Sequence, residues 1–324
     1  MALLRNDSLN KLQSSISDIT SGQSITFWAN SIAESLTTLV TKKGNAVDLY
    51  ELLKLRNVFV HELNDDDPKS PFKASLVNRG SHYDLYLNSI RISSSNEKKF
   101  ILAHEIAHTL FYTNKDGVFI KNTTLDFGSD EIEHICDYLA ICLLLPKNSI
   151  TEEISDYIAD QDSMQKRNAN YLNFIFALAA RYQVNWHSVL YRLMMNFGFL
   201  PNSLCIEFSK KDNWYITWCS QTDSLEQRGL FIPFISKSEN RFVSAKESFT
   251  IILEKVITDV SRTPRKYGHV TISKSIFDKG YRGGIKRFLT RDFTPKVDIL
   301  KIYYRVDSST NIILLFPFDG LLIT

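Results

Sequence analysis

Residues 100–111 read FILAHEIAHTLF and contain the motif H-E-x-x-H at positions 104–108. The flanking residues are apolar with a helical rhythm and include no Gly or Pro, which predicts that the motif lies on a helix. Residues four apart share one face of a helix, with Cβ atoms about 5–6 Å apart. His104 and His108 at that spacing can bind one zinc ion, and Glu105 can then reach a water on the metal.

A zinc hydrolase site needs a third protein ligand and keeps a fourth position open for water. Residues 129–146, SDEIEHICDYLAICLLLP, predict a second helix with acidic residues in its first turn and a stop at its final Pro. Glu133 and Asp137 are four apart, so both can face the first helix. Glu133 is a candidate third ligand, and Glu131 and His134 are competing ligands. Asp137 could accept a hydrogen bond from the far nitrogen of a ligating His and fix its tautomer.

The stretch from Asp48 to Pro146 resembles the ImmA/IrrE family of bacterial zinc metallopeptidases. In that family a short helix, a small strand pair, the H-E-x-x-H helix and a second helix follow one another, and this chain is similar at each step. The matching segments are residues 48–60 for the opening helix and first strand, 75–78 and 83–89 for the sheet, and 99–108 and 133–146 for the two site helices.

The resemblance implies that His104, His108 and Glu133 are zinc ligands and that Glu105 is the general base. The implied fold is a mainly helical, zincin-like metallopeptidase domain with a small sheet and a glutamate as third ligand, as in gluzincins. The departures from the family pattern are all apolar and leave this ligand set intact; they lie at Ile106, Ala107, Leu139 and Leu145.

The expected chemistry is hydrolysis of a peptide bond. Zinc lowers the pKa of a water toward about 7, and Glu105 takes its proton during attack and then delivers it to the leaving amine. Side chains that could stabilise the oxyanion or contact substrate are Tyr112, Tyr138, His82 and His134. Because the ligands are nitrogen and oxygen atoms, Mn²⁺ or another divalent ion could take the place of zinc. The strand expected at residues 83–88 could be an edge strand that pairs with extended substrate backbone.

Composition is that of a globular protein with two or three domains: 324 residues, 44% hydrophobic and 23% charged. The net charge of +2 provides no strong steering field, so nucleic-acid contact would require a local basic patch. No apolar stretch approaches the roughly 20 residues of a membrane span, and the first residues lack the apolar core of a signal peptide. The four cysteines, which show no C-x-x-C spacing, are expected to be reduced, as in a cytoplasmic protein.

We expect an α+β protein of three parts: the metallopeptidase domain at residues 1–148, a helical segment at 149–200 and a C-terminal domain at 201–324. Residues 178–193, LAARYQVNWHSVLYRL, predict a helix-turn-helix with Asn185 as the N-cap of its second helix. Its only cationic candidates are Arg181, His187 and Arg192. That is sparse for DNA binding, which depends on neutralising phosphates, so a packing module is the favoured interpretation.

The C-terminal part alternates between strand-like and helical segments, which predicts an α+β sensor-like domain. The strands are expected at residues 204–208, 214–219, 299–304 and 311–316, around a helix at 248–260. The order of peptidase, helix-turn-helix and sensor resembles the radiation-response IrrE branch, whose last domain is GAF-like. Residues 262–296 are locally basic with interleaved aromatics, which suits nucleic-acid or phosphate-ligand contact; the candidate patch is Lys279, Arg282, Lys286 and Arg287.

The resemblance implies that the substrate is a helix-turn-helix transcriptional repressor, whose cleavage would derepress stress, DNA-damage or mobile-element genes. The alternative is a catalytically silent binding platform that regulates a repressor or a toxin–antitoxin partner. The intact ligand set favours the enzyme, because a degenerate site usually loses Glu105 or one of the two His residues.

Overall fold

The predicted α+β fold class is confirmed in the computed structural model of the protein, whose chain divides into two units. The first unit comprises Met1–Asp156 with Leu178–Arg192, and the second comprises Tyr157–Ala177 with Leu193–Thr324. The structure describes residues 25–40, 42–43, 46–64, 72–115, 117–121, 129–163, 170–197, 199–200, 202–222, 241–242, 248–262, 266–273, 299–308 and 310–317. None of the helices in these ranges combines the length and apolar character that a membrane crossing requires.

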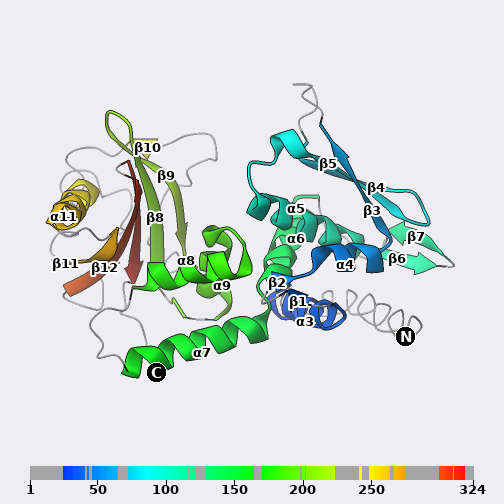
Figure 1. Ribbon diagram of the computed structural model, residues 1–324, viewed down its shortest axis with the longest axis horizontal. Coiled ribbons are helices and arrows are strands. Elements are labelled where there is room, and N and C mark those ends of the chain that lie inside the picture. The colour runs from blue at the N-terminus through cyan, green and yellow to red at the C-terminus, as the bar shows by residue number, and fades with distance from the viewer. Residues whose placement is uncertain are drawn as a thin grey trace. The chain divides into compact units, whose positions relative to one another are not determined.

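The helices of the first unit pack around α6 (Ser129–Leu144). The bounds of α6 are close to those predicted for the second site helix, residues 129–146. Helix α5 (Ser95–Thr109), which contains the H-E-x-x-H motif, and α3 (Ile25–Thr38) both contact α6 (Figure 1). Helix α4 (Leu49–Leu55) contacts α5 in turn. The apolar side chains buried on these helices include Ile32, Leu36, Leu102, Ile106, Leu139 and Leu143. Each such side chain contributes roughly 1.5–3 kcal/mol on burial, so this packing fixes α5 and α6 against each other.

The first unit also contains a three-stranded sheet in the order β3-β5-β4. Strand β5 (Tyr83–Asn88) pairs in parallel with β3 (Val58–Leu63) and antiparallel with β4 (Ala74–Asn78). The prediction that residues 83–88 form an edge strand is therefore wrong, because both of its edges are occupied. Within the described residues, the outer strands β3 and β4 of this sheet each have one unpaired edge.

The remaining strands of the first unit form two small hairpins, and a single-turn helix follows the sheet. The hairpins are β1 (Lys42–Lys43) with β2 (Ala46–Val47) and β6 (Tyr112–Lys115) with β7 (Val118–Lys121); the short helix is η1 (Ser89–Arg91).

Helices α7 (Lys147–Ser163), α8 (Tyr171–Tyr182) and α9 (Trp186–Asn196) each contribute residues to both units. The predicted N-cap of α9 is confirmed: the Asn185 side-chain oxygen accepts a hydrogen bond from the His187 backbone N–H at 3.1 Å. Helices α8 and α9 thus form the predicted helix, short turn and helix.

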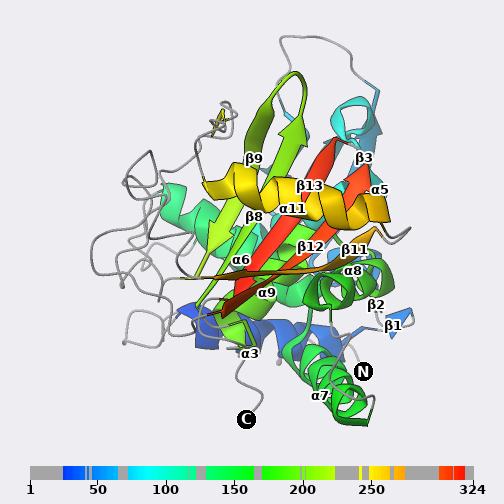
Figure 2. The same ribbon diagram turned by 90° about the vertical axis from the view of Figure 1, so that its left-hand side faces the viewer.

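The second unit is built on a six-stranded antiparallel sheet in the order β10-β9-β8-β13-β12-β11. Helix α11 (Ser248–Arg262) runs across one face of this sheet (Figure 2). Its apolar side, with Ile252, Leu253 and Val256, packs into a core with side chains from all the long strands. The strands are β8 (Ser203–Lys210), β9 (Trp214–Gln221), β10 (Arg241–Phe242), β11 (Tyr267–Ser273), β12 (Ile299–Ser308) and β13 (Asn311–Pro317).

The first half of α8 covers the opposite face of the same sheet. The Tyr171 and Tyr303 rings meet edge to face, with centroids 5.0 Å apart. Asn170 caps α8 by accepting from the Leu172 backbone N–H at 3.0 Å, and its Nδ2 donates to the Gly268 carbonyl of β11 at 3.1 Å. The sheet of the second unit is therefore enclosed by helices on both faces.

Gly268 on β11 lies against Tyr304, so Gly268→Ala should destabilise the second unit. A Cβ at this position would lie 2.6 Å from Tyr304 Oη. The same hydroxyl donates to Asp259 Oδ2 on α11 at 2.5 Å, so moving the ring disrupts that hydrogen bond. We expect a loss of about 1–3 kcal/mol in the free energy of unfolding, measured by chemical denaturation. Thr271→Ala, an exposed change in the same strand, is the control; equal stability of the two variants would contradict this account of the packing.

Candidate metal centre

Helix α5, which carries the H-E-x-x-H motif, begins at a capping arrangement. Ser94 Oγ accepts a hydrogen bond from the Glu97 backbone N–H at 3.1 Å. The Glu97 carboxylate reaches back to the Ser93 backbone N–H at 2.6 Å and forms an ion pair with Lys73. Two backbone donors at the helix start thus find side-chain acceptors, which fixes the residue at which the helix begins.

Stability should depend on pH through Glu97. The hydrogen bond from Lys73, with those from Ser93, lowers the pKa of Glu97 from its ordinary value of 4.5 to about 2. Because the folded pKa is the lower one, this contribution is complete above about pH 4.5 and is lost as pH falls toward 2. Denaturation at a series of pH values should therefore show a shallower loss of stability in this window for Glu97→Gln than for the native chain. Parallel pH profiles for the two proteins would contradict this role for the Glu97 carboxylate.

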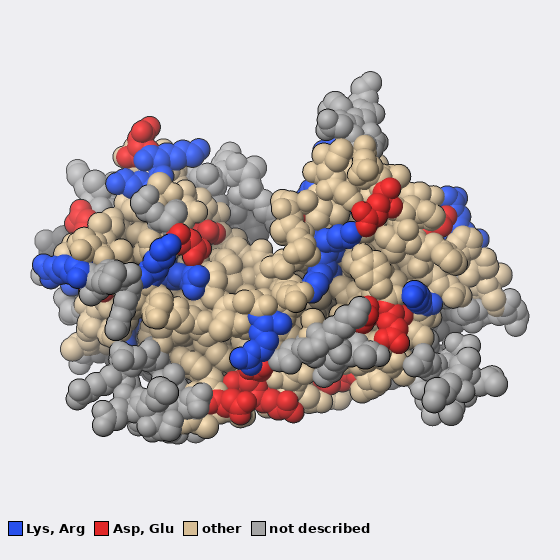
Figure 3. Space-filling view, viewed as in Figure 1, with Lys and Arg blue, Asp and Glu red and all other residues tan. Residues whose placement is uncertain are grey.

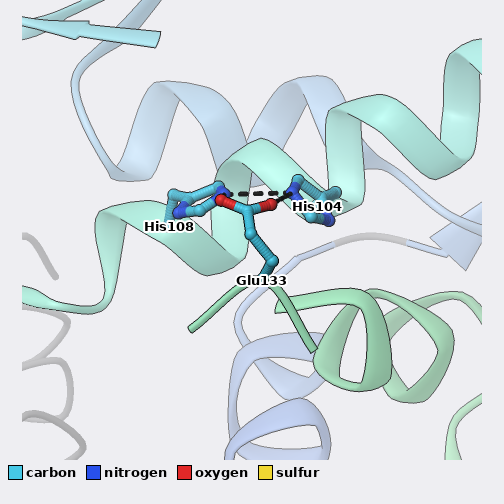
Figure 4. Close-up of side chains that lie close together, drawn as sticks. All are labelled: His104, His108 and Glu133. Atoms are coloured by element: carbon cyan, nitrogen blue, oxygen red, sulfur yellow. Dashed lines mark hydrogen bonds and ion pairs between the residues drawn. The ribbon is translucent and has the colours of Figure 1, made fainter. Parts of the chain in front are cut away.

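Three side chains from α5 and α6 converge on one point (Figure 4). Nε2 of His104 lies 3.0 Å from Nε2 of His108. The Glu133 carboxylate faces both rings, with Oε2 at 3.1 Å from His104 Nε2 and Oε1 at 3.4 Å from His108 Nε2. Two ligands bound to zinc at about 2.0–2.1 Å with tetrahedral angles are roughly 3.3 Å apart, so this spacing suits a metal ion.

Asp137, one turn after Glu133 on α6, lies beside the His104 imidazole. Its Oδ1 lies 2.8 Å from Nδ1 of His104. A proton on Nδ1 leaves a lone pair on Nε2, which is the atom that faces His108 and Glu133. Nitrogen lone pairs and a carboxylate pointed at one another repel, and a bound cation relieves that repulsion. The donor set therefore fits a divalent metal ion.

The titration of the site reflects burial and the closeness of these charges. Burial raises the pKa of Glu105 to about 7, with His104 acting to lower it and Glu133 to raise it. Burial also lowers the pKa of His104, but Asp137 and the other nearby carboxylates outweigh this and raise it. Burial and the adjacent His104 lower the pKa of His108, which favours the neutral, ligating form of that ring. A cation at the site would lower the pKa of Glu105 again and leave it a base at neutral pH.

Residues 58–194 match a peptidase family whose model is described as the IrrE N-terminal-like domain. This region of the chain is similar to the IrrE N-terminal-like domain. The matched region includes the three-stranded sheet and both helices that bear His104, His108 and Glu133, so the resemblance seen in the sequence is confirmed. The region that is similar to a peptidase family therefore also contains three side chains close enough to hold a metal ion. A comparison of the whole chain with curated proteins finds no match.

The two tyrosines considered as oxyanion or substrate contacts lie in different surroundings. The Tyr112 ring, just after α5, lies edge-on to Tyr83, with centroids 5.8 Å apart. Tyr138 is only 9% exposed, lies against Tyr191 of α9, and its pKa is raised to about 12, chiefly by burial. These contacts place Tyr138 in the helical core, whereas Tyr112 is part-buried beside the sheet.

The two histidines considered for the same role are more exposed. His82 lies edge-on to Phe59, with centroids 5.3 Å apart, and 3.8 Å from Asp84, on the sheet. His134 is exposed on α6, and the group of possible metal ligands contains Glu133 rather than its competitors His134 and Glu131.

Charged side chains suggest no extended basic surface in the part of the chain that the structure describes. On the face drawn in Figure 3, Lys and Arg are interspersed with Asp and Glu. Within the α8–α9 pair, Arg181 forms an ion pair with Glu153, and Arg192 is completely buried. Arg192 thus cannot contact a phosphate in this fold. The candidate patch lies outside the described residues: Lys279, Arg282, Lys286 and Arg287.

Proposed function

We propose that the first unit is a zinc-dependent endopeptidase in which His104, His108 and Glu133 hold the metal. The observation that carries the proposal is the convergence of two imidazole nitrogens and a carboxylate on one point. Two His and one Glu are the ligands of a known class of catalytic zinc sites, which keep a further position open. The proposed fold is zincin-like, with a glutamate as third ligand, and the family match to a peptidase domain supports both parts.

The proposed chemistry divides between the ion and Glu105. When bound, the ion supplies Lewis-acid polarisation of a water and of the peptide carbonyl. The Glu105 carboxylate takes a proton from the attacking water and passes it to the leaving amine. Asp137 would hold the His104 ring in the tautomer that keeps Nε2 free to bind the ion.

We propose a helix-turn-helix transcriptional repressor as the substrate, cut so that stress, DNA-damage or mobile-element genes are derepressed in the cytoplasm. The support is the match to the IrrE N-terminal-like domain together with the resemblance to the ImmA/IrrE family in sequence. The α8–α9 pair is proposed to pack against the peptidase rather than to read DNA, because its Arg192 is buried and its Arg181 is paired with Glu153.

The second unit is proposed to be a GAF-like sensor that regulates the peptidase. Its support is the topology: the sheet is antiparallel, its first long strand β8 lies beside its last strand β13, and helices cover both faces.

The proposal is tested by incubating the zinc-loaded full-length protein with helix-turn-helix repressors from the same genome and identifying the products by mass spectrometry. We expect one repressor to be cut at a single bond, and chelation of the metal to abolish the cut. Repressors that bind tightly and stay intact with the zinc-loaded protein would instead support a binding platform.

A further inference from the structure

Two arginines are almost fully enclosed in the first unit, although neither belongs to the metal site. Arg56 is 4% exposed and follows the last turn of α4, and Arg192 on α9 is 0% exposed. A guanidinium keeps its charge in a protein interior, and burying it is costly unless its donors are satisfied. The groups that accept hydrogen bonds from these two side chains therefore indicate what each arginine does.

Arg56 binds the carboxyl end of α5. Its Nη2 donates to the Thr109 carbonyl at 2.6 Å, and its Nε donates to Thr109 Oγ1 at 3.0 Å. Thr109 is the last residue of α5 and directly follows His108. Thr109 Oγ1 donates in turn to the Ile106 carbonyl at 2.6 Å, so the guanidinium is tied to the final turn at two points. The positive group lies at the negative end of the helix dipole, where it is favoured.

Arg192 makes the corresponding contact at the carboxyl end of α6. Its Nε donates to the Leu145 carbonyl at 3.1 Å, and Leu145 directly follows that helix. Its Nη1 donates to Cys142 Sγ at 3.1 Å, and its Nη2 donates to Asn30 Oδ1 on α3 at 2.6 Å. One side chain thus joins α9, the end of α6 and α3.

We propose that Arg56 and Arg192 are positioning residues that set the geometry of the metal site by clamping the carboxyl ends of its two ligand helices. The inference rests on the proposed metal site and deepens it. Helix α5 brings His104 and His108, and α6 brings Glu133, so the distance between the ligand atoms depends on how these two helices are rotated and advanced along their axes. Functional groups need placement within about 0.5 Å, and a helix end tied by a rigid guanidinium fork has little freedom to shift.

The proposal also assigns a task to the α8–α9 pair. Arg192, which was a candidate for contact with DNA, is buried inside the protein. There it connects α9 to the helix that bears Glu133 and Asp137. The helical segment that follows the peptidase helices is, on this account, part of the metal site's support.

Zinc affinity, measured by competition with a chromophoric chelator, tests the proposal in the full-length protein. Arg56→Met and Arg192→Met keep much of the side-chain length but lose the donors, whereas Arg56→Lys and Arg192→Lys keep the charge and lose the fork. We expect the Met variants to bind zinc at least about tenfold more weakly, the lower limit seen when groups that orient metal ligands are removed. The Lys variants should fall between the Met variants and the native chain. With Co²⁺ in place of zinc, the visible absorption bands should also change in the Met variants, because they report the coordination geometry.

Removing a buried arginine can also prevent folding, so a second pair of variants keeps the test decisive. Thr109→Val retains the shape of the side chain but removes the Oγ1 acceptor, whereas Thr109→Ser retains the acceptor. We expect weaker zinc binding for Thr109→Val and near-native binding for Thr109→Ser. Val58→Ala, a buried truncation in β3, serves as a control that lowers stability but removes no hydrogen bond to either helix end.

The outcomes separate this inference from the proposed function. If the native protein binds zinc and the Arg and Thr109→Val variants bind it equally tightly while losing only stability, the arginines are structural and the inference is overturned. The proposed function would stand in that case. If the native protein binds neither zinc nor another divalent ion, the metal site is wrong and both proposals fall.

Discussion

Glu105→Gln should keep the metal and lose peptide hydrolysis. Glutamine has almost the same shape as glutamate but cannot accept the proton of an attacking water. General acid–base groups contribute about 10²- to 10⁴-fold to the rate, so we expect a fall of that size in single-turnover cleavage of the repressor. Metal content and the free energy of unfolding should stay close to those of the native protein, because Glu105 is not among the three side chains that converge on the metal position.

The matched control for this variant is Glu152→Gln, which makes the same change at an exposed position on α7. It should cleave at the native rate. Undiminished cleavage by Glu105→Gln would remove Glu105 from the mechanism, and an effect on gene expression that survives this change would favour the binding platform.

His108→Ala should abolish metal binding at working concentrations. Changing groups that merely orient a ligand weakens metal affinity by about 10- to 100-fold, so losing a ligand should cost more than that. Glu133→Ala should act in the same direction, because its carboxylate lies 3.1 and 3.4 Å from the two imidazole nitrogens. Both are measured by equilibrium dialysis against zinc.

His134→Ala is the informative control for the ligand assignment. His134 is next to Glu133 on α6 but is exposed and outside the converging group. It should bind zinc as the native chain does. Loss of zinc from His134→Ala with retention in Glu133→Ala would make His134 the third ligand.

The residues of the candidate metal centre could be predicted because their placement depends on local geometry. His104 with His108, and Glu133 with Asp137, are pairs four residues apart on helices, and helical periodicity alone places each pair on one face. The structure brings the two faces together, with Asp137 at 2.8 Å from the far nitrogen of His104. The apolar stripes of the helices indicate which faces pack inward. The packing of these two helices against each other could therefore also be predicted from the sequence.

Other features depend on contacts between distant segments, which sequence patterns do not specify. Alternation identifies β5 as a strand, but it does not tell whether a neighbour lies on each edge, so its central place was missed. Arg56 and Arg192 look like ordinary cations at helix ends or surfaces. Their burial depends on carbonyl partners 53 and 47 residues away, at Thr109 and Leu145. One sequence signal could have predicted the burial of Arg192. It is a charged residue inside an otherwise apolar stripe of α9.

Elemental analysis of the purified native protein tests the central claim most directly. We expect close to one zinc per chain, or one equivalent that is taken up on dialysis against zinc and removed by a chelator. A protein that binds no divalent metal under these conditions would contradict the metal centre, because the convergence of His104, His108 and Glu133 would then have no cation to explain it.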